Sequence, residues 1–457
     1  MQVLYFAQTH DSPKRKETVM IQRFSKQILS LIFLEGAAAD WHWRRTASSS
    51  LTRHKHEFRD IVTWVCRSWR SAALSTPRIW AQIDLSYPTP HGRTALYIAR
   101  TGATGSLHIH LDANRRFFKD TDEDDWGERS DLLHDRLEDL AENICETERW
   151  KSIYLNIACE VDTSATIFFL SEVAKFPNLE SFTLIGHQDP RVRLEEQLDT
   201  MTPIISDPEP ADSKLRSVHL KLFSMNFLAE SQLGTTILSR LTFLELGLLD
   251  STPSVSQICQ MLSDNPNLRT FRLRLGSDPP NQELKVTGED DMMEVDQYVS
   301  TLSRLEEFSL IHTRSALWTY ELLSALNLPS LRKLWFSVHA FCSDDMSSVA
   351  AFLATGPAFP ALRYLATNLD YEPLVIPLLH AYPQLERLML LPGHGMGRSI
   401  ALGQAPWLLP YLTHLGVSDY DRDALRVIRM ACERQDYRNS IPIVVTGGAN
   451  IYDCYHQ

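Results

Sequence analysis

The segment Leu305-Glu306-Glu307-Phe308-Ser309-Leu310 carries the pattern that decides the fold. Its first, fourth and sixth residues are apolar, and polar residues fill its other positions. The pattern occurs ten times, with Thr367 in place of the last apolar residue in one copy, beginning at Trp150, Leu179, Leu215, Leu241, Leu268, Leu305, Leu331, Leu362, Leu385 and Leu412. Successive beginnings are separated by 29, 36, 26, 27, 37, 26, 31, 23 and 27 residues. Ten matches at such regular spacing indicate an internal structural repeat.

These separations are typical of leucine-rich repeats, whose period is about 20–29 residues, with polar insertions lengthening some units. Each repeat is expected to form a short strand and then a returning helix, such as Val255 to Leu262, Ser347 to Leu353 or Leu374 to His380. Because one unit cannot bury its own apolar face, neighbouring units must stack into a curved solenoid. The asparagine that follows the strand in regular repeats is mostly missing, so we expect irregular repeats without an asparagine ladder.

The predicted fold class is α/β: a small all-helical N-terminal domain followed by an irregular solenoid with a curved parallel sheet and outer helices. We expect a disordered tail at residues 1–18, the helical domain at 19–86, the solenoid at 87–436 and a C-terminal cap at 437–457. The strand side of a solenoid is a binding surface. Its outward positions between the repeat leucines are mixed in charge, as Arg269, Glu306 and Lys333 illustrate.

The helical domain is expected to begin with a helix near Met20. Apolar residues recur there at intervals of three and four, at Ile21, Phe24, Ile28, Leu31 and Ile32. Gly36 is predicted to end this helix. The serine-rich and basic stretch from Asp40 to His56 predicts a loop, so the domain carries a loop insertion at residues 40–57.

The stretch from Phe58 to Ser86, FRDIVTWVCRSWRSAALSTPRIWAQIDLS, predicts a helix, a short second helix and a strand. Helical spacing places one shared set of residues on a single apolar face: Ile61, Val62, Val65, Cys66 and Trp69. Pro77 suits the first turn of the short helix. Ile83 and Leu85 then alternate with polar residues, which indicates a half-buried strand.

From Val65 to Ser86 this stretch resembles the end of an F-box in the large fungal family of F-box proteins. The shared wording is V-C-R-x-W-R-x-x-A-L-S-T-P-R-I-W-x-x-I-D-L-S. The usual opening of the box, Leu-Pro-x-Glu-hydrophobic-Leu and then Ile-Phe, reads here Phe24-Ser25-Lys26-Gln27-Ile28-Leu29 and then Ile32-Phe33. The apolar half is retained, whereas the proline that fixes φ at the helix start is replaced by serine.

The resemblance implies the substrate-recognition subunit of an SCF-type (Skp–cullin–F-box) ubiquitin ligase. In such a protein the box binds a Skp-family adaptor, the repeats bind a protein target, and the chain itself is not an enzyme. Carried over position by position, the resemblance assigns the adaptor contacts to Phe24, Ser25, Gln27, Ile28, Leu29, Ile32, Phe33, Val65, Cys66 and Trp69. The alternative is a repeat scaffold with a degenerate box that does not bind the adaptor, which the Phe24-Ser25 step favours.

Composition limits the other classes of function. With 45 Lys and Arg against 57 Asp and Glu, the chain carries a net charge of −12, which disfavours nucleic acid and anionic membranes as partners. The seven scattered cysteines form no C-x-x-C pair, so we expect a reducing compartment, the cytoplasm or the nucleus. We expect no membrane span, because no apolar run approaches the roughly 18 residues required.

Three further stretches could suggest a ligand. His108, His110 and Asp112 form an H-x-H-x-D set on a predicted strand, where all three would share one face, so a metal-dependent hydrolase is a second alternative. An exposed polar strand face explains the same alternation. The acidic run 120–125 lacks the glycine and glutamate of a calcium loop, and the glycines of 393–397 match no phosphate-binding motif. No cofactor is therefore expected.

Overall fold

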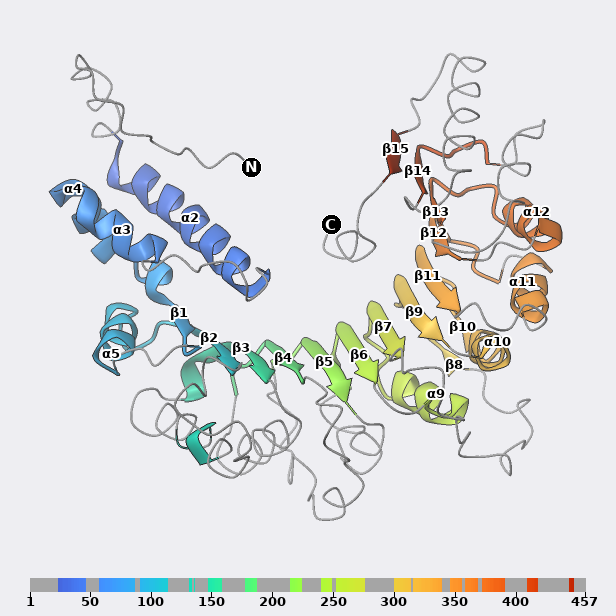
Figure 1. Cartoon of the computed structure of the whole chain (residues 1–457), viewed down its shortest axis with the longest axis horizontal. Helices are drawn as coiled ribbons and strands as arrows, with labels where there is room; N and C mark the ends of the chain where they lie inside the picture. The colour runs from blue at the N-terminus through green and yellow to red at the C-terminus, as the bar shows by residue number, and fades with distance from the viewer. Residues whose placement is uncertain are drawn as a thin grey trace.

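The computed structural model describes seventeen ranges of the chain, and all structural statements concern these: 24–46, 57–86, 91–113, 131–133, 135, 147–157, 177–186, 214–223, 240–248, 252–275, 300–313, 315–338, 346–355, 358–368, 372–390, 409–417 and 444–447. Thirteen strands form one parallel sheet in chain order (Figure 1). They are β1 (Gln82–Asp84), β2 (Leu107–Ala113), β3 (Trp150–Ile157), β4 (Ser181–Ile185), β5 (Ser217–Phe223), β6 (Phe243–Leu248), β7 (Thr270–Leu275), β9 (Glu307–Thr313), β11 (Lys333–Val338), β12 (Tyr364–Thr367), β13 (Arg387–Leu390), β14 (His414–Val417) and β15 (Val444–Gly447).

The ten predicted repeats are confirmed as ten strands of this sheet, β3 to β7, β9 and β11 to β14. Their first-position residues are all buried, as in Leu305 and Leu331, which are 0% exposed. The fourth positions lie in register across the sheet, so Phe271 pairs with Phe308 and Phe308 with Leu334. The repeat pattern is therefore the row of side chains that builds the core. The predicted α/β solenoid with a parallel sheet is confirmed.

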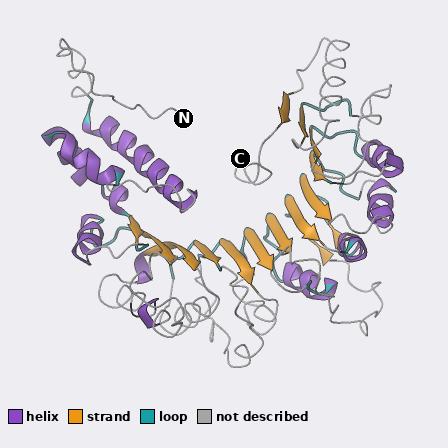
Figure 2. Ribbon diagram, in the orientation of Figure 1, coloured by secondary structure: helices purple, strands orange, loops and turns teal. Residues whose placement is uncertain are grey.

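Helices lie on the outer, convex side of the sheet (Figure 2), as predicted. They include α9 (Val255–Ser263), α10 (Ala316–Ser324), α11 (Met346–Ala354) and α12 (Glu372–Ala381). Ser254 starts α9 with a capping box, in which its side chain accepts from the Gln257 N–H and the Gln257 side chain accepts from the Ser254 N–H. Two short strands, β8 (Ser300–Thr301) and β10 (Leu326–Asn327), pair separately beside these helices.

Backbone hydrogen bonds join successive repeats at the entrance to each strand. The carbonyl of the second residue of each repeat from Glu180 to Glu386 accepts two N–H groups from the next repeat. The Arg269 carbonyl, for example, accepts from Glu306 at 2.8 Å and from Glu307 at 2.9 Å. We call this row of paired bonds the entrance ladder. It satisfies the backbone of the turn without any side-chain amide.

The N-terminal helices form a head at the β1 end of the sheet (Figure 1). They are α2 (Lys26–Thr46), α3 (Phe58–Val65), α4 (Arg67–Leu74), the short 3₁₀ helix η1 (Pro77–Trp80) and α5 (His91–Arg100), and a further 3₁₀ turn, η3 (Thr147–Arg149), precedes β3. One hydrophobic core runs from Leu29 in the head to Leu415 in β14. Strand β1, which we placed in the helical domain, is therefore also the first strand of the solenoid sheet.

The prediction that α2 ends at Gly36 and that a loop begins at Asp40 is wrong. The helix runs through both residues and ends at Thr46. The helix continues through Ala37, Ala38 and Ala39, which are strong helix formers. A side chain at Gly36 would place a Cβ only 2.2 Å from the ring of Phe58. Glycine here lets the Phe58 ring pack against the helix, and that close approach, rather than termination, explains the residue.

The prediction of one continuous helix face from Ile61 to Trp69 is also wrong. Cys66 has an extended backbone, with φ −161° and ψ 171°, and divides α3 from α4. Its Sγ accepts the N–H of Trp69 at 3.5 Å and so caps α4. Val62 is 1% exposed whereas Ile61 and Val65 are 45% and 54% exposed, so the expected face is split.

Several sequence predictions lie outside the described residues. They are the tail at 1–18, the remainder of the predicted loop at 47–56, the acidic run 120–125, the glycine-rich stretch 393–397, and most of the C-terminal cap.

Candidate functional site

The first candidate surface is the side of α2 that faces away from the core. Phe24, Ile28, Leu31 and Ile32 follow helical spacing and are 42%, 46%, 64% and 43% exposed. The buried residues of the same helix, including Phe33, lie on the opposite side. Helix α2 is therefore apolar on two sides: the side with Leu29 and Phe33 is buried, and the side with Ile28 and Ile32 is exposed.

Helix α3 repeats this arrangement. Ile61, Trp64 and Val65 are 45%, 57% and 54% exposed, whereas Val62 and Arg59 are buried. A helix of a soluble protein that is apolar on both sides normally buries both. Helices α2 and α3 are in contact with each other, and exposed apolar side chains on adjacent helices are a feature of interaction sites. We call this set the outward apolar face: Phe24, Ile28, Leu31, Ile32, Ile61, Trp64 and Val65.

The structure sorts the ten predicted adaptor contacts into three groups. Six are exposed, namely Phe24, Ser25, Gln27, Ile28, Ile32 and Val65, and two are half-buried, namely Cys66 and Trp69. Leu29 and Phe33 are 1% and 0% exposed and belong to the head's own core, so they are not accessible to a partner in this conformation.

Ser25 stands where the family has proline. Its Oγ accepts the N–H of Ile28 at 3.3 Å and so caps α2, which replaces the missing proline as a helix-start device. Residue-by-residue transfer did not include Leu31, Ile61 and Trp64. Ile61 and Trp64 are three residues apart and therefore share one side of α3. A break at Cys66 would have had to be predicted for this spacing to indicate that the side is exposed.

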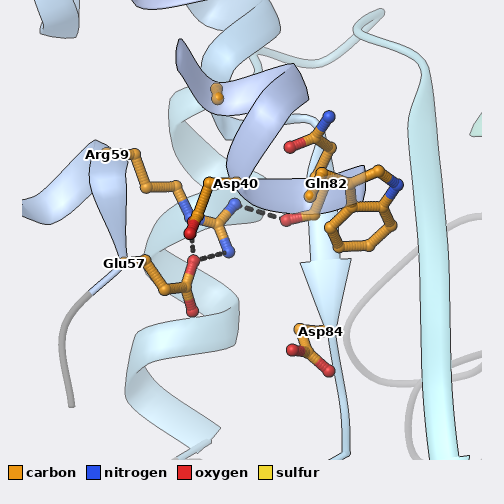
Figure 3. Close-up of a pocket in the computed structure, with 7 residues that line it drawn as sticks. Asp40, Glu57, Arg59, Gln82 and Asp84 are labelled. Carbon is orange, nitrogen blue, oxygen red and sulfur yellow. Dashed lines mark hydrogen bonds and ion pairs between the residues drawn. The ribbon is translucent and has the colours of Figure 1, made fainter. Parts of the chain in front are cut away.

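Arg59 ties the head to the first strand of the sheet. Its guanidinium donates to the backbone carbonyl of Gln82 in β1 and pairs with Glu57 (Figure 3). It lies 3.8 Å from the centre of the Tyr97 ring, a cation–π contact. The side chain of Arg59 is only 5% exposed. Gln82 lies on β1, an edge strand of the sheet. Because its carbonyl already accepts a hydrogen bond from Arg59, it is less available for pairing with another strand.

A second set of contacts ties α3 to α5. Asp60 pairs with Arg93 and accepts the Tyr97 hydroxyl at 2.7 Å. Arg93 Nε also donates to the Tyr97 oxygen at 2.7 Å. Burial and the nearby carboxylate of Glu57 raise the pKa of Tyr97 well above its ordinary value. The tyrosine therefore stays neutral and keeps its hydrogen-bond donor.

The H-x-H-x-D set lies on β2 with its side chains on one face, as expected for a strand. The expectation of an exposed face is wrong, because His110 and Asp112 are 2% and 7% exposed. Trp41 of α2 meets the His110 ring edge-on at 5.3 Å between ring centres, and Tyr154 stacks on it at 4.9 Å. The C-terminal half of α2 covers this part of the sheet.

Each member of the set has its own protein partner. His108 contacts the Ser152 hydroxyl at 2.7 Å, and Asp112 accepts from the Asn156 amide at 3.0 Å. His110 Nδ1 lies 3.1 Å from Asp84. Among the described residues, no group of three or more His, Cys, Asp or Glu side chains is arranged to hold a metal ion. These three side chains hold neighbouring strands and α2 together.

Asp84 is the most perturbed acid of this junction. Burial acts to raise its pKa, but the hydrogen bond and charge of His110 and the hydrogen bonds from Ser86 together hold its pKa below the ordinary value. Asp84 also lines a small pocket with Asp40, Glu57 and Arg59 at the joint between head and sheet (Figure 3). Arg59 pairs with Glu57 and donates to the Gln82 carbonyl across the pocket. Asp40 accepts the Phe58 N–H and Asp84 contacts His110, so the polar lining has protein partners, which suits a structural joint.

No family model matches the chain, and no curated protein matches it. In the part of the chain that the structure describes, none of the helices combines the length and the apolar character needed to cross a bilayer.

Proposed function

We propose that the chain is the substrate-recognition subunit of an SCF-type ubiquitin ligase. The observation that carries the proposal is the outward apolar face of the head, whose seven apolar side chains are 42% to 64% exposed on α2, on α3 and at Phe24 just before α2. The resemblance of residues 65–86 to the end of an F-box supplies the partner that this face suits, a Skp-family adaptor. The proposal places the protein in the cytoplasm or the nucleus, where this machinery works.

In this function the chain acts by proximity. The head binds the adaptor, the solenoid binds a protein target, and the target is held at high effective concentration near the ubiquitin-loaded enzyme. Burying the seven side chains of the outward apolar face in an interface would stabilise the complex, at about 25 cal/mol for each Å² of apolar surface. The Arg59 contacts support this function because they fix the head against the sheet.

A repeat scaffold that does not bind the adaptor is the second candidate. The replacement of Leu-Pro by Phe24-Ser25 favours it, because the usual opening of the box is lost. In that case the outward apolar face binds a different protein. One binding experiment separates the two candidates.

The experiment is isothermal titration of the full chain with a purified Skp-family adaptor. The double variant Ile28→Asp, Ile32→Asp places two charges on the outward apolar face, at residues 46% and 43% exposed. We expect the native chain to bind and the double variant to bind more than a hundredfold more weakly, because buried anchors dominate such interfaces. Leu29 is unsuitable for substitution because it is buried in the head.

Leu317→Asp is the matched control. Leu317 lies on α10, far along the chain from the head, and is 51% exposed. This variant should bind the adaptor like the native chain. Absence of binding by the folded native chain, or equal binding by the double variant, would reject the ligase proposal and favour the scaffold.

A further inference from the structure

Five charged side chains cross the concave face of the sheet as a diagonal row. They are Lys221 on β5, Glu245 on β6, Arg272 on β7, Glu307 on β9 and Lys333 on β11. Register places Glu245 beside Arg272, and Glu307 beside Lys333. We call this row the charge stripe. Its signs alternate, and a lysine stands at each end.

The stripe is joined by ion pairs between neighbouring strands. Glu245 contacts Lys221 at 3.0 Å and Arg272 at 4.0 Å. Glu307 contacts Arg272 at 2.6 Å and Lys333 at 3.5 Å. His219 adds a contact to Glu245 at 3.3 Å. Two carboxylates are thus shared by three permanent cations, and the stripe carries a positive excess although the whole chain is acidic.

The two carboxylates of the stripe are less exposed than the lysines at its ends. Glu245 and Glu307 are 17% and 20% exposed, whereas Lys221 and Lys333 are 31% and 60% exposed. Burial acts to raise the pKa of Glu245, but the His219 hydrogen bond and the nearby Lys221 lower it to about 2. The more exposed charges of the stripe are therefore the lysines at its two ends, and the glutamates hold the cations in place.

We propose that the charge stripe binds an acidic segment of the protein target. This inference rests on the proposed function only in taking a protein to be what the solenoid binds. From Lys221 to Lys333 the stripe crosses four strand spacings and four residues along the strands, a diagonal of about 23 Å, which an extended segment of about seven residues spans. Charge complementarity favours acidic side chains at both ends of that segment.

Nucleic acid fits this surface less well than an acidic peptide. A phosphate backbone carries one charge at every nucleotide and would meet the two glutamates as well as the cations. A peptide can place its carboxylates at the lysines alone. The charge of −12 on the whole chain also repels a polyanion that extends beyond the stripe.

The test is fluorescence anisotropy with the full chain and a labelled peptide of eight glutamates, with no adaptor present. Failure of the adaptor proposal therefore leaves this result unaffected. The variant is Lys221→Glu, Lys333→Glu. Its matched control is Lys151→Glu, Arg269→Glu, which changes the net charge equally at side chains 41% and 65% exposed at the strand entrances. Circular dichroism checks that both proteins fold.

We expect the native chain to bind the glutamate peptide, with an affinity that falls as salt is added. The stripe variant should bind more than tenfold more weakly, and the control variant should bind within about threefold of the native chain. Failure of the native chain to bind would overturn the proposal. Equal losses in the variant and its control, or tighter binding of an eight-residue thymidine oligonucleotide than of the peptide, would overturn it too.

Discussion

The outward apolar face of the head and the charge stripe of the sheet are both exposed, yet they differ in how complete they are. The stripe pairs its own charges, with Arg272 bonded to Glu307 at 2.6 Å, and is stable in water without a partner. The outward apolar face consists of apolar side chains that are partly exposed to water, with Leu31 64% exposed and Trp64 57%. A partner would therefore contribute affinity at the head and selectivity at the stripe.

The contrast is sharpest at two neighbouring residues of α2. Phe33 is 0% exposed and packs on Trp69 with 5.1 Å between ring centres, whereas Ile32 is 43% exposed. We expect Phe33→Ala to lower the free energy of unfolding by about 4 kcal/mol, because it leaves a cavity in the core. Ile32→Ala should cost less than about 0.5 kcal/mol. Urea unfolding followed by circular dichroism measures both.

A comparable loss in the two variants would contradict the division of α2 into a core side and a partner side. It would mean that another part of this chain covers Ile32. The outward apolar face would then no longer support an adaptor.

The contacts of Arg59 between the head and the sheet give the second-largest expected loss of stability. Arg59→Met removes the side-chain partner of the Gln82 carbonyl and leaves the Glu57 carboxylate with only its 3.4 Å contact to Arg93 among the ion pairs of the described residues. We expect a loss of about 3 kcal/mol in the free energy of unfolding, as for other broken buried ion pairs. Arg78→Met is the control, because Arg78 is exposed on η1. A loss equally large in Arg78→Met would show that any arginine of this segment matters, rather than the joint.

The smallest expected loss of stability comes from a substitution in the charge stripe. Glu245→Gln removes the carboxylate shared by Lys221 and Arg272, and should cost about 1–2 kcal/mol at neutral pH. The pKa of Glu245 is about 2 in the folded chain, below its ordinary value of 4.5. Its stabilisation is therefore present above pH 4.5 and is lost as the pH falls towards 2.

The difference in unfolding free energy between the native chain and Glu245→Gln should shrink over that acidic range. Urea titrations at several pH values measure it. Glu306→Gln serves as the control, since Glu306 is 46% exposed in a 3.8 Å pair and should change stability by less than about 0.5 kcal/mol. A constant difference at all pH values would show that hydrogen bonding, rather than charge, gives Glu245 its effect.

The repeat strands could be predicted because the pattern that defines them is also what builds the core. Leu305, Phe308 and Leu310 are each 0% exposed, so their spacing is visible in the sequence. The extent of α2 could not be read in the same way. Glycine ends many helices, and the close approach of Phe58, 22 residues further on, explains why a glycine stands inside this one.

The candidate surfaces were predictable only in part. Apolar spacing finds Ile28 and Ile32 but does not separate them from Leu29 and Phe33, because the direction of the core depends on how α3 and α4 pack. The charge stripe was less visible still. Lys221 and Lys333 are 112 residues apart in the chain, and only strand order and register bring them onto one diagonal.

The entrance ladder has a consequence for how this chain can evolve. Its bonds use backbone atoms alone, so the second residue of each repeat can change without loss of the turn, and glutamate, arginine and threonine all stand there, at Glu180, Arg216 and Thr242. Each strand that the ladder joins is also anchored where it begins, whatever the length of the segment before it. New binding specificities could therefore arise through point substitutions and insertions while the architecture is inherited unchanged.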